Sequence, residues 1–303
     1  MEDKKEKLPS TRIQWYPGHM AKTRRQIIED LKFVDIVIEL LDSRIPISSQ
    51  NPDIAKITEG KKKVIVLNKS DLADEKQNLL CVNYFKRNNI PAILVDANTG
   101  KGIENVIKKI EEVMDLNMKE QAEKGRVGRK IRAMILGIPN VGKSSFINRI
   151  SKRTTAIVGN RPGITKQKQW IRINDKIELL DTPGVLWPKF ENNEVALNLA
   201  FTGTIKEDVI EKTEIAYELI KFLIKGYRKN LCDKYNLQES YIENVLLQEQ
   251  PENFNIYEIM LEIGRRRGCI VSGGEIDDEK TAKIILDDFK NGRLGRITIE
   301  HCM

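Results

Sequence analysis

The sequence predicts an α/β fold, with a mostly parallel sheet covered by helices on both faces and a smaller helical C-terminal domain after it. Short apolar runs alternate with helical patterns up to about residue 190, as in open parallel sheets. Within this part, residues 137–144 (GIPNVGKS) match the phosphate-loop pattern G-x-x-x-x-G-K-[ST], which lies between a strand and a helix. Beyond residue 190, apolar residues recur at helical spacing instead.

Each element follows from its local pattern. The apolar run FVDIVIELL at 33–41 is typical of a buried strand, whereas 21–32 places Ile27, Ile28 and Leu31 on one helical face. The basic segment 121–130 is expected to be a linker or an exposed loop, and 205–227 a single helix. Strands are expected at 33–41, 64–67, 92–95, 131–136, 169–173 and 176–180, and helices at 21–32, 75–88, 102–114, 144–150 and within 194–250 and 254–292. We therefore divide the chain into an N-terminal extension (1–25), a sheet domain (26–190) and a helical domain (191–303).

The composition is that of an ordinary soluble globular protein, with 303 residues, 40% hydrophobic and 31% charged. No apolar run approaches the ~18 residues of a membrane span, and the first ten residues lack the apolar segment of a signal peptide. The four cysteines are scattered without a CxxC pair, which argues against a zinc site or a disulfide framework. We expect a cytoplasmic, monomeric protein without a membrane partner.

Positive charge is concentrated in the first two-thirds of the chain. The net charge is +7, but residues 1–190 contain 36 Lys and Arg against 23 Asp and Glu, while residues 191–303 contain 15 against 21. Such a basic surface either attracts a polyanion or is simply a solvated, lysine-rich surface. Charge alone does not decide between the two.

The phosphate loop predicts a nucleotide site. Its backbone N–H groups wrap phosphates, Lys143 reaches the β- and γ-phosphates, and the Ser144 hydroxyl ligates Mg²⁺. A chance match to the pattern is the alternative, but the apolar strand before it and the helix after it supply the required context. The residues expected to contact the phosphates are Asn140, Val141, Gly142, Lys143, Ser144 and Ser145.

Two further segments favour guanine. Asp71, in the sequence NKSD at 68–71, can accept both N1–H and N2–H₂ of guanine, whereas adenine offers no matching donors. Asn68 is expected to serve the O6/N7 side, and the stem of Lys69 to cover the base face. A helix cap is the alternative for this tetrapeptide. The loop that starts with Asp96, Ala97 and Asn98 follows an apolar run and is expected to support the base.

Two more loops complete a set for Mg²⁺ and the γ-phosphate. Asp181, in DTPG at 181–184, is placed to hold Mg²⁺ through water, and the Gly184 N–H to meet the γ-phosphate. Thr165, in RPGIT at 161–165, is the candidate for a second hydroxyl on the metal. A simple turn after a strand is the alternative for DTPG.

These loops form a full guanine-nucleotide set in an unusual order, because 68–71 and 96–98 precede 137–144. The chain therefore resembles circularly permuted P-loop GTPases. The elements QWYPGHM (14–20), GIPNVGKSS (137–145), RPGITK (161–166) and DTPGVLWPKF (181–190) make it similar to ribosome biogenesis GTPase A of bacteria over nearly its whole length. Asp96, where Ser is commoner, and Leu72 are small departures. The resemblance implies GTP hydrolysis to GDP, assembly of the large ribosomal subunit and rRNA binding by the helical domain.

The residue that performs hydrolysis is less evident. Val185 follows the DTPG turn and cannot orient water as a Gln does there in many GTPases, so intrinsic hydrolysis should be slow. His19 either packs beside Trp15 and Tyr16, contacts RNA, or acts in catalysis; in the resembled family the matching His is the proposed catalytic residue. Asn140 either shapes its turn or helps to hold a K⁺ near the phosphates, as in K⁺-dependent GTPases.

Basic clusters are the candidate RNA contacts. Arg265, Arg266 and Arg267 form the densest basic run of an otherwise acidic domain, although Arg at a helix C-terminus also complements the helix dipole. A second cluster consists of Lys22, Arg24 and Arg25. The expected function is a GTP-hydrolysing switch, stimulated by the ribosomal subunit. The alternatives are a nucleotide-gated RNA-binding module with incidental hydrolysis, and a signalling GTPase with a protein effector.

Overall fold

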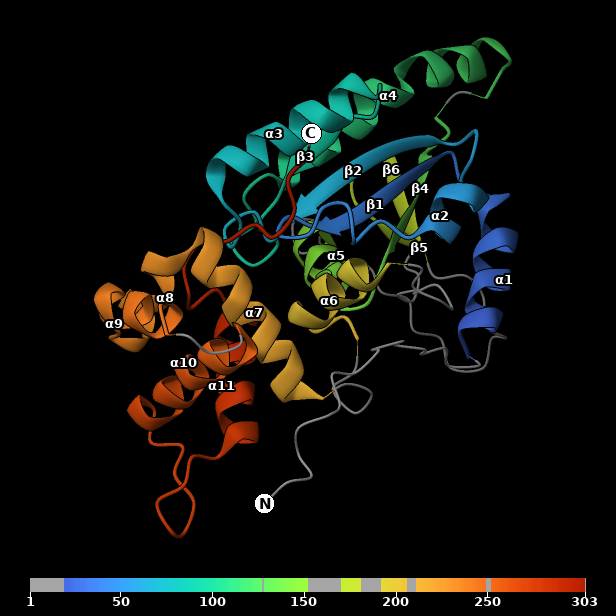
Figure 1. Cartoon of the computed structure of the whole chain (residues 1–303). Helices are drawn as coiled ribbons and strands as arrows, with labels where there is room; N and C mark the ends of the chain where they lie inside the picture. Colours follow the sequence, from blue (N-terminus) through green and yellow to red (C-terminus); the bar gives the residue numbers. More distant parts are fainter. Residues whose placement is uncertain are drawn as a thin grey trace.

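The computed structural model describes residues 19–126, 128–151, 170–180, 192–205, 211–248 and 252–302, without the side chains of 19–21, 252 and 253. Within these ranges, six strands form one sheet in the order β3-β2-β1-β4-β6-β5 (Figure 1). Neighbouring strands are parallel, except that β5 is antiparallel to β6. The strands are β1 (Ile36–Asp42), β2 (Lys62–Asn68), β3 (Ala92–Leu94), β4 (Ile131–Gly137), β5 (Trp170–Arg172) and β6 (Ile177–Leu180), and the helices are α1 (His19–Leu31), α2 (Pro52–Ile57), α3 (Glu75–Arg87), α4 (Ile103–Glu123), α5 (Lys143–Ser151), α6 (Asn193–Phe201), α7 (Lys212–Gly226), α8 (Arg228–Tyr235), α9 (Glu239–Leu246), α10 (Glu252–Arg266) and α11 (Asp278–Lys290).

Helices cover both faces of the sheet, as predicted. Successive side chains of a strand point to opposite faces, so β1 contributes to more than one core. Ile38 and Leu40 pack in a core with residues of α4 and α5, while Val37 packs with residues of α1 and α2. On the second face, α3 packs against β2 through Phe85. The central strands are therefore buried on both sides, which explains their uninterrupted apolar sequences.

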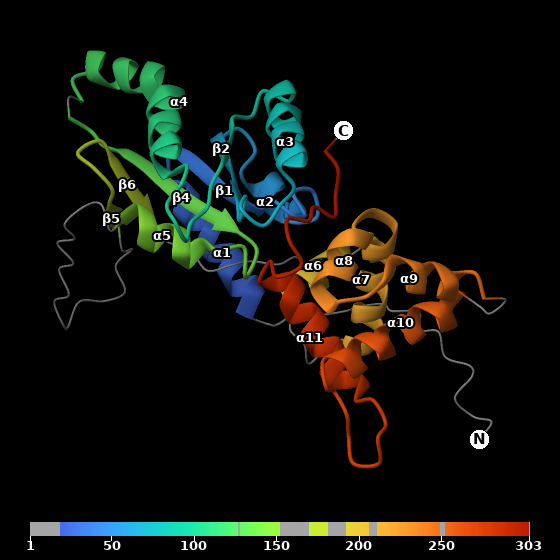
Figure 2. The same ribbon diagram turned by 90° about the vertical axis from the view of Figure 1, so that its left-hand side faces the viewer.

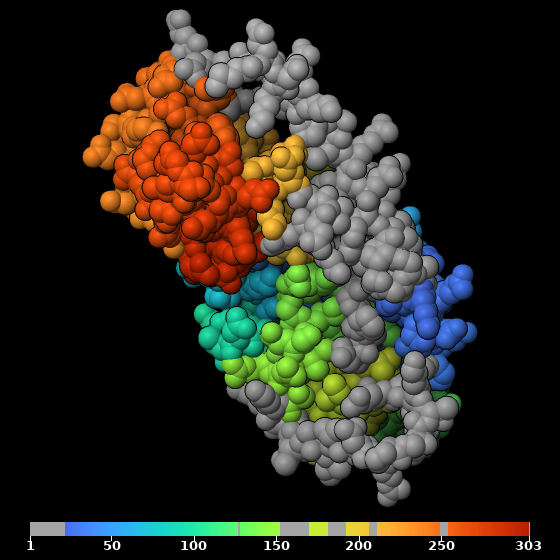
Figure 3. Space-filling view, turned by 90° about the horizontal axis from the view of Figure 1, so that it is seen from below, coloured from blue at the N-terminus to red at the C-terminus, as the bar shows by residue number. Residues whose placement is uncertain are grey.

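Helices α7 to α11 share a separate hydrophobic core, so the predicted helical C-terminal domain is present. Figure 1 shows this group beside the sheet, and Figure 3 shows the two parts as adjoining lobes with the yellow α6 between them. α6 belongs to both, since Leu199 packs in the sheet core and Phe201 in the helical core. None of the described helices has the length and apolar character needed to cross a membrane.

Two predicted boundaries are wrong by more than a helical turn. α4 continues to Glu123, beyond the predicted end at Met114, because residues 115–123 are mostly good helix formers although few of them are apolar. α7 begins at Lys212, not at Ile205. Gly203 has a φ of +72°, a left-handed conformation that ends α6 and that the apolar pattern alone does not predict.

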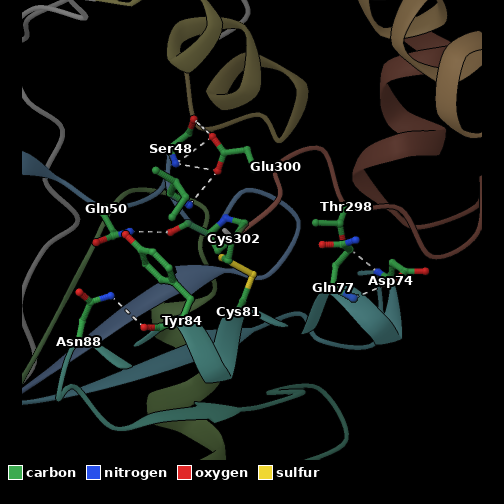
Figure 4. Close-up of a disulfide and its surroundings, with 12 residues drawn as sticks. Ser48, Gln50, Asp74, Gln77, Cys81, Tyr84, Asn88, Thr298, Glu300 and Cys302 are labelled. Carbon is green, nitrogen blue, oxygen red and sulfur yellow. Dashed lines mark hydrogen bonds between the residues drawn. A yellow bond between two sulfur atoms is a disulfide. The ribbon is translucent and has the colours of Figure 1, made fainter. Parts of the chain in front are cut away.

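The last residues return from α11 to the sheet domain, where the C-terminus lies near α3 and β3 (Figure 1). The Ile297 N–H donates to the Leu72 carbonyl at 2.9 Å, and the Ile299 N–H to the Arg44 carbonyl at 2.8 Å. The Glu300 carboxylate accepts the backbone N–H of Ser48 at 2.8 Å (Figure 4). Residues 296–300 therefore tie the end of the helical domain to the loops at the carboxyl edge of the sheet.

This tail ends in a disulfide between Cys302 and Cys81 of α3 (Figure 4). The sequence argued against a disulfide framework, and this interpretation is wrong for these two cysteines. They are 221 residues apart in sequence, so no local spacing pattern could indicate the pair. Cys232 and Cys269 are free and buried.

Candidate nucleotide-binding site

The predicted base and phosphate loops meet at the carboxyl edge of the sheet. β1 lies between β2 and β4, and Asp42 at its end is aligned with Asn68 at the end of β2. Ligands bind at this edge in open α/β sheets. A cavity of about 310 Å³ opens there, and among the predicted residues its lining includes Asn68, Lys69, Asp71, Asp96, Ala97, Asn98, Gly142 and Ser145.

The phosphate loop runs from the end of β4 to the start of α5, where Lys143 and Ser144 are the first two residues. The N-terminus of α5 is an intrinsic anion site because its unpaired N–H groups and dipole attract negative charge. Gly142 has a φ of +97°, and a Cβ there would lie 2.3 Å from Nδ2 of Asn68. Only glycine therefore allows this loop and the base loop to approach so closely.

Asn68 joins three loops through its side-chain amide. Its Nδ2 donates to the Val141 carbonyl at 2.8 Å, and its Oδ1 accepts the Ala97 N–H at 3.1 Å. Both ends of the amide thus make contacts within the protein, and the expected contact with O6 and N7 of guanine stays a prediction, for which Nδ2 has a second N–H. In this structure Asn68 is a positioning residue that holds the phosphate loop and the Ala97 loop against the base loop.

Lys69 spans the gap between the base loop and the phosphate loop. Its Nζ donates to the Asn140 carbonyl at 2.7 Å and lies 2.9 Å from Oδ2 of Asp42. Its stem consequently crosses one side of the cavity, which fits the predicted role of covering the base. Asn140 has a φ of +60°, and its side-chain amide donates to the Gly203 carbonyl just after α6.

The two carboxylates of the base site differ in their electrostatics. Burial raises the pKa of Asp71, and repulsion from Asp96 raises it further. Burial also tends to raise the pKa of Asp96, but hydrogen bonds from Thr99 and Asn98 outweigh this effect and lower the pKa. Asp96 therefore serves its own loop as an acceptor, while Asp71 faces the cavity without an equivalent set of donors. The prediction that Asp71 receives the guanine N–H groups is consistent with this difference.

The structure describes only some of the residues predicted to bind Mg²⁺ or to act in catalysis. Ser144 stands at the start of α5, as a hydroxyl ligand of a phosphate-bound cation requires. Thr165, Asp181, Gly184 and Val185 lie outside the described residues, as does the side chain of His19, the first residue of α1. Within the described residues, no three His, Cys, Asp or Glu side chains form a metal site of their own.

The predicted RNA-contact arginines of α10 have partners within the chain. Arg265 and Arg266 pair with Glu262, and Arg267 pairs with Asp288 at 3.3 Å and lies over the ring of Tyr235. In the other cluster, Arg24 approaches Asp53 at 3.8 Å. Lys22 and Arg25 also lie in α1.

Sequence reasoning missed two pairs of residues at this site. Asp42, the last residue of β1, and Arg44, two residues later, form a buried ion pair beside Lys69. An acid and a base at the end of a buried strand, on the edge where ligands bind, could have indicated them. Lys290 and Asn291, at the end of α11, also line the cavity. They are far from the phosphate loop in sequence and carry no motif.

Comparison with known proteins agrees with this geometry. Residues 132–255 match the protein family described as "50S ribosome-binding GTPase". Ribosome biogenesis GTPase A of Bacillus cereus is 43% identical, over 95% of this chain and 93% of that protein. The crystal structure of GNP-bound YlqF from T. maritima has a TM-score of 0.63 at 24% identity, over 93% of this chain and 98% of that chain, and shows the shared fold. The chain therefore belongs to the ribosome biogenesis GTPase A family, whose members hydrolyse GTP on a circularly permuted GTPase fold.

Proposed function

We propose that this GTPase is a switch in assembly of the large ribosomal subunit, in which residues 191–303 bind ribosomal RNA and the subunit stimulates hydrolysis. The observation that carries the proposal is a second, cationic cavity on the helical domain. It has a volume of about 250 Å³ and is lined by Lys234, Tyr235, Asn236, Arg266 and Arg267.

The charges around this cavity favour a polyanion. Asp288 is buried and is shared by Lys234 at 3.6 Å, Arg267 at 3.3 Å and Arg293 at 2.8 Å. One carboxylate cannot neutralise three cations, so positive charge remains for phosphate groups. Arg265 is more exposed and pairs with Glu262, an arrangement that binding RNA would have to disrupt or share. Lys22, Arg24 and Arg25 are proposed as a second contact.

Within the sheet domain (26–190), we assign the nucleotide roles as the sequence suggests. Asp71 receives guanine, Lys143 and the loop amides bind the phosphates, and Ser144, Thr165 and Asp181 hold Mg²⁺. When bound, the ion neutralises charge that develops on the phosphates. We place the protein in the cytoplasm, as a monomer, where bacterial subunits are assembled.

GTP turnover measured with and without purified large subunits tests the switch. We expect stimulation by the subunit, and an association whose logarithmic affinity falls linearly with the logarithm of salt concentration, because RNA phosphates release counterions. Binding without stimulation would favour the nucleotide-gated RNA module. Salt-insensitive association with a protein instead of ribosomal particles would favour a signalling GTPase.

Guanine recognition by Asp71 has its own test. Xanthine carries a carbonyl oxygen where guanine carries N2–H₂, so the amide of Asp71→Asn can donate to it. We expect this variant to lose GDP affinity by about 100-fold or more and to gain affinity for xanthosine diphosphate. Loss of both nucleotides would point to misfolding, and unchanged GDP binding would contradict the assignment.

A further inference from the structure

The nucleotide cavity has a wall that does not belong to the sheet domain. Lys290 and Asn291, at the C-terminal end of α11, line the same cavity as Asp71 and Ala97. α11 belongs to the C-terminal domain, and its C-terminal end points toward the sheet domain (Figure 2). A ligand filling this cavity would touch both parts of the protein.

Arg44 holds this end of α11 in place. Its Nη1 donates to the carbonyls of Phe289 at 3.0 Å and Lys290 at 3.2 Å, which are among the last four carbonyls of the helix. The guanidinium also lies 5.1 Å from the centre of the Phe289 ring. Arg44 is only 1% exposed, so these contacts are shielded from solvent. The negative end of a helix dipole attracts a buried cation, so Arg44 stabilises the C-terminal end of α11 in this position.

The same arginine is connected to the nucleotide loops through Asp42. Nε and Nη2 of Arg44 bind the two oxygens of the Asp42 carboxylate at 3.0 and 2.9 Å. Oδ2 of Asp42 also contacts Nζ of Lys69, which in turn binds the phosphate loop at the Asn140 carbonyl. One carboxylate thus joins the lysine that crosses the base site to the arginine that holds α11.

Direct packing joins the two parts a second time. A Cβ on Gly292 would lie 2.5 Å from Cδ2 of Leu72, a residue of the cavity wall, so the backbone after α11 rests against the base loop. The Lys290 side chain passes beside Gly203, whose carbonyl accepts the Asn140 amide. The end of α11 therefore contacts both the base loop and the segment that touches the phosphate loop.

We propose that Lys290 and Asn291 are nucleotide-binding residues, and that Asp42 and Arg44 are positioning residues that place them in the site. Nucleotide binding and docking of the helical domain are then coupled. Bound nucleotide favours the docked position of α11, and by reciprocity any RNA that shifts the helical domain changes nucleotide affinity. This inference rests on the proposed placement of guanine beside Asp71.

Equilibrium binding of GDP to the full chain tests whether Lys290 and Asn291 contact the nucleotide. We expect Asn291→Ala to weaken binding about 5-fold and Lys290→Ala about 10-fold, the usual effects of losing a neutral and a charge-assisted hydrogen bond. Lys283→Ala is the matched control, because Lys283 is an exposed lysine of the same helix outside the cavity lining. Wild-type GDP affinity in both variants would overturn the proposal.

Hydrogen exchange tests the coupling separately. The amides of Asn291 and Gly292 bond to the carbonyls of Asp287 and Phe289. GDP should slow their exchange in the wild-type protein, and Arg44→Lys, which keeps the charge but loses the planar fork, should reduce this protection. Unchanged exchange with GDP would exclude the coupling. If Asp71→Asn exchanges guanine for xanthine while the α11 variants bind normally, the guanine site stands and only this inference fails.

Discussion

The carboxylate of Asp42 is bound at both oxygens by the guanidinium of Arg44, at 3.0 and 2.9 Å, and both side chains are at least 98% buried. Burial alone would raise the pKa of Asp42, but the neighbouring charges of Arg44 and Lys69 hold it well below its usual range. The aspartate is therefore ionised under all ordinary conditions. Through this ion pair, Arg44 connects the sheet domain to the end of α11.

Removing one member of this pair should be costly. Arg44→Ala leaves Asp42 buried with only Lys69 as an opposite charge and removes the Arg44 hydrogen bonds to the Phe289 and Lys290 carbonyls. We expect a loss of about 3–5 kcal/mol in the free energy of unfolding, measured by urea denaturation. Arg24→Ala is the control, because its exposed pair with Asp53 at 3.8 Å should contribute less than about 1 kcal/mol. An equal loss of unfolding free energy in both variants would contradict a special contribution of the Asp42–Arg44 pair to stability.

The raised pKa of Asp71 predicts how GDP binding responds to acid. Guanine N–H groups need an ionised acceptor, so affinity is full above the pKa and falls as pH decreases through it. Since burial and Asp96 raise this pKa above the ordinary value of 3.8, affinity should begin to fall at a higher pH than an unperturbed aspartate would give. GDP titrations at decreasing pH measure the midpoint. Xanthosine diphosphate binding by Asp71→Asn should lack this transition; the same midpoint in the variant would assign it to another group.

Local patterns predicted the parts of the fold that depend on neighbouring residues. The strand from Ile36 follows from its apolar run, and the loop from Gly137 to Lys143 follows from its glycine spacing. The structure brings the base and phosphate loops to one cavity. The burial of Val37 and Ile38 on opposite faces also follows from the two-residue period of a strand.

Contacts between distant segments could not be predicted in this way. Arg44 bonds to residues 245 and 246 positions later in the chain, and nothing in the sequence near Phe289 indicates this. The contacts of Asn68 with Val141 and Ala97 were not predicted for a similar reason, since these partners are defined only once three strands are aligned. Both cases are polar contacts between segments that are distant in sequence, and a local pattern of apolar residues does not encode such contacts.

The Cys81–Cys302 pair predicts a redox effect on stability. In the oxidised protein, a digest without reductant should yield a peptide pair joining these residues, and alkylation after unfolding should label only Cys232 and Cys269. Reduction should lower the free energy of unfolding by about 2–4 kcal/mol, because the unfolded chain regains the entropy of a long closed loop. Cys302→Ser should no longer respond to reductant. A response as large as that of the wild type would place the effect elsewhere.

Asn140 allows the proposed K⁺ role to be tested. Its amide nitrogen is directed to the Gly203 carbonyl, which leaves the side-chain oxygen on the other side of the amide. If that oxygen helps to hold K⁺ near the phosphates, GTP turnover should be at least about 10-fold faster in K⁺ than in Na⁺ at equal ionic strength. Asn140→Ala should turn over equally in both salts. Equal wild-type rates would leave Asn140 as a turn residue joined to Gly203.

His19 is the proposed source of the catalytic group that Val185 cannot supply. It is the first residue of α1, a helix anchored on the sheet by the buried Ile27 and Leu31. His19→Ala should lower subunit-stimulated GTP turnover by about 100-fold while leaving GTP affinity unchanged. His19→Gln should retain more activity than His19→Ala, because a glutamine can orient water. Gln26→Ala, in the same helix, is the control, since the Gln26 amide donates to Asp30 one turn later at 3.0 Å. Unchanged stimulated turnover in His19→Ala, with normal GTP affinity, would exclude the histidine from the reaction and assign the water-orienting group to the ribosomal subunit.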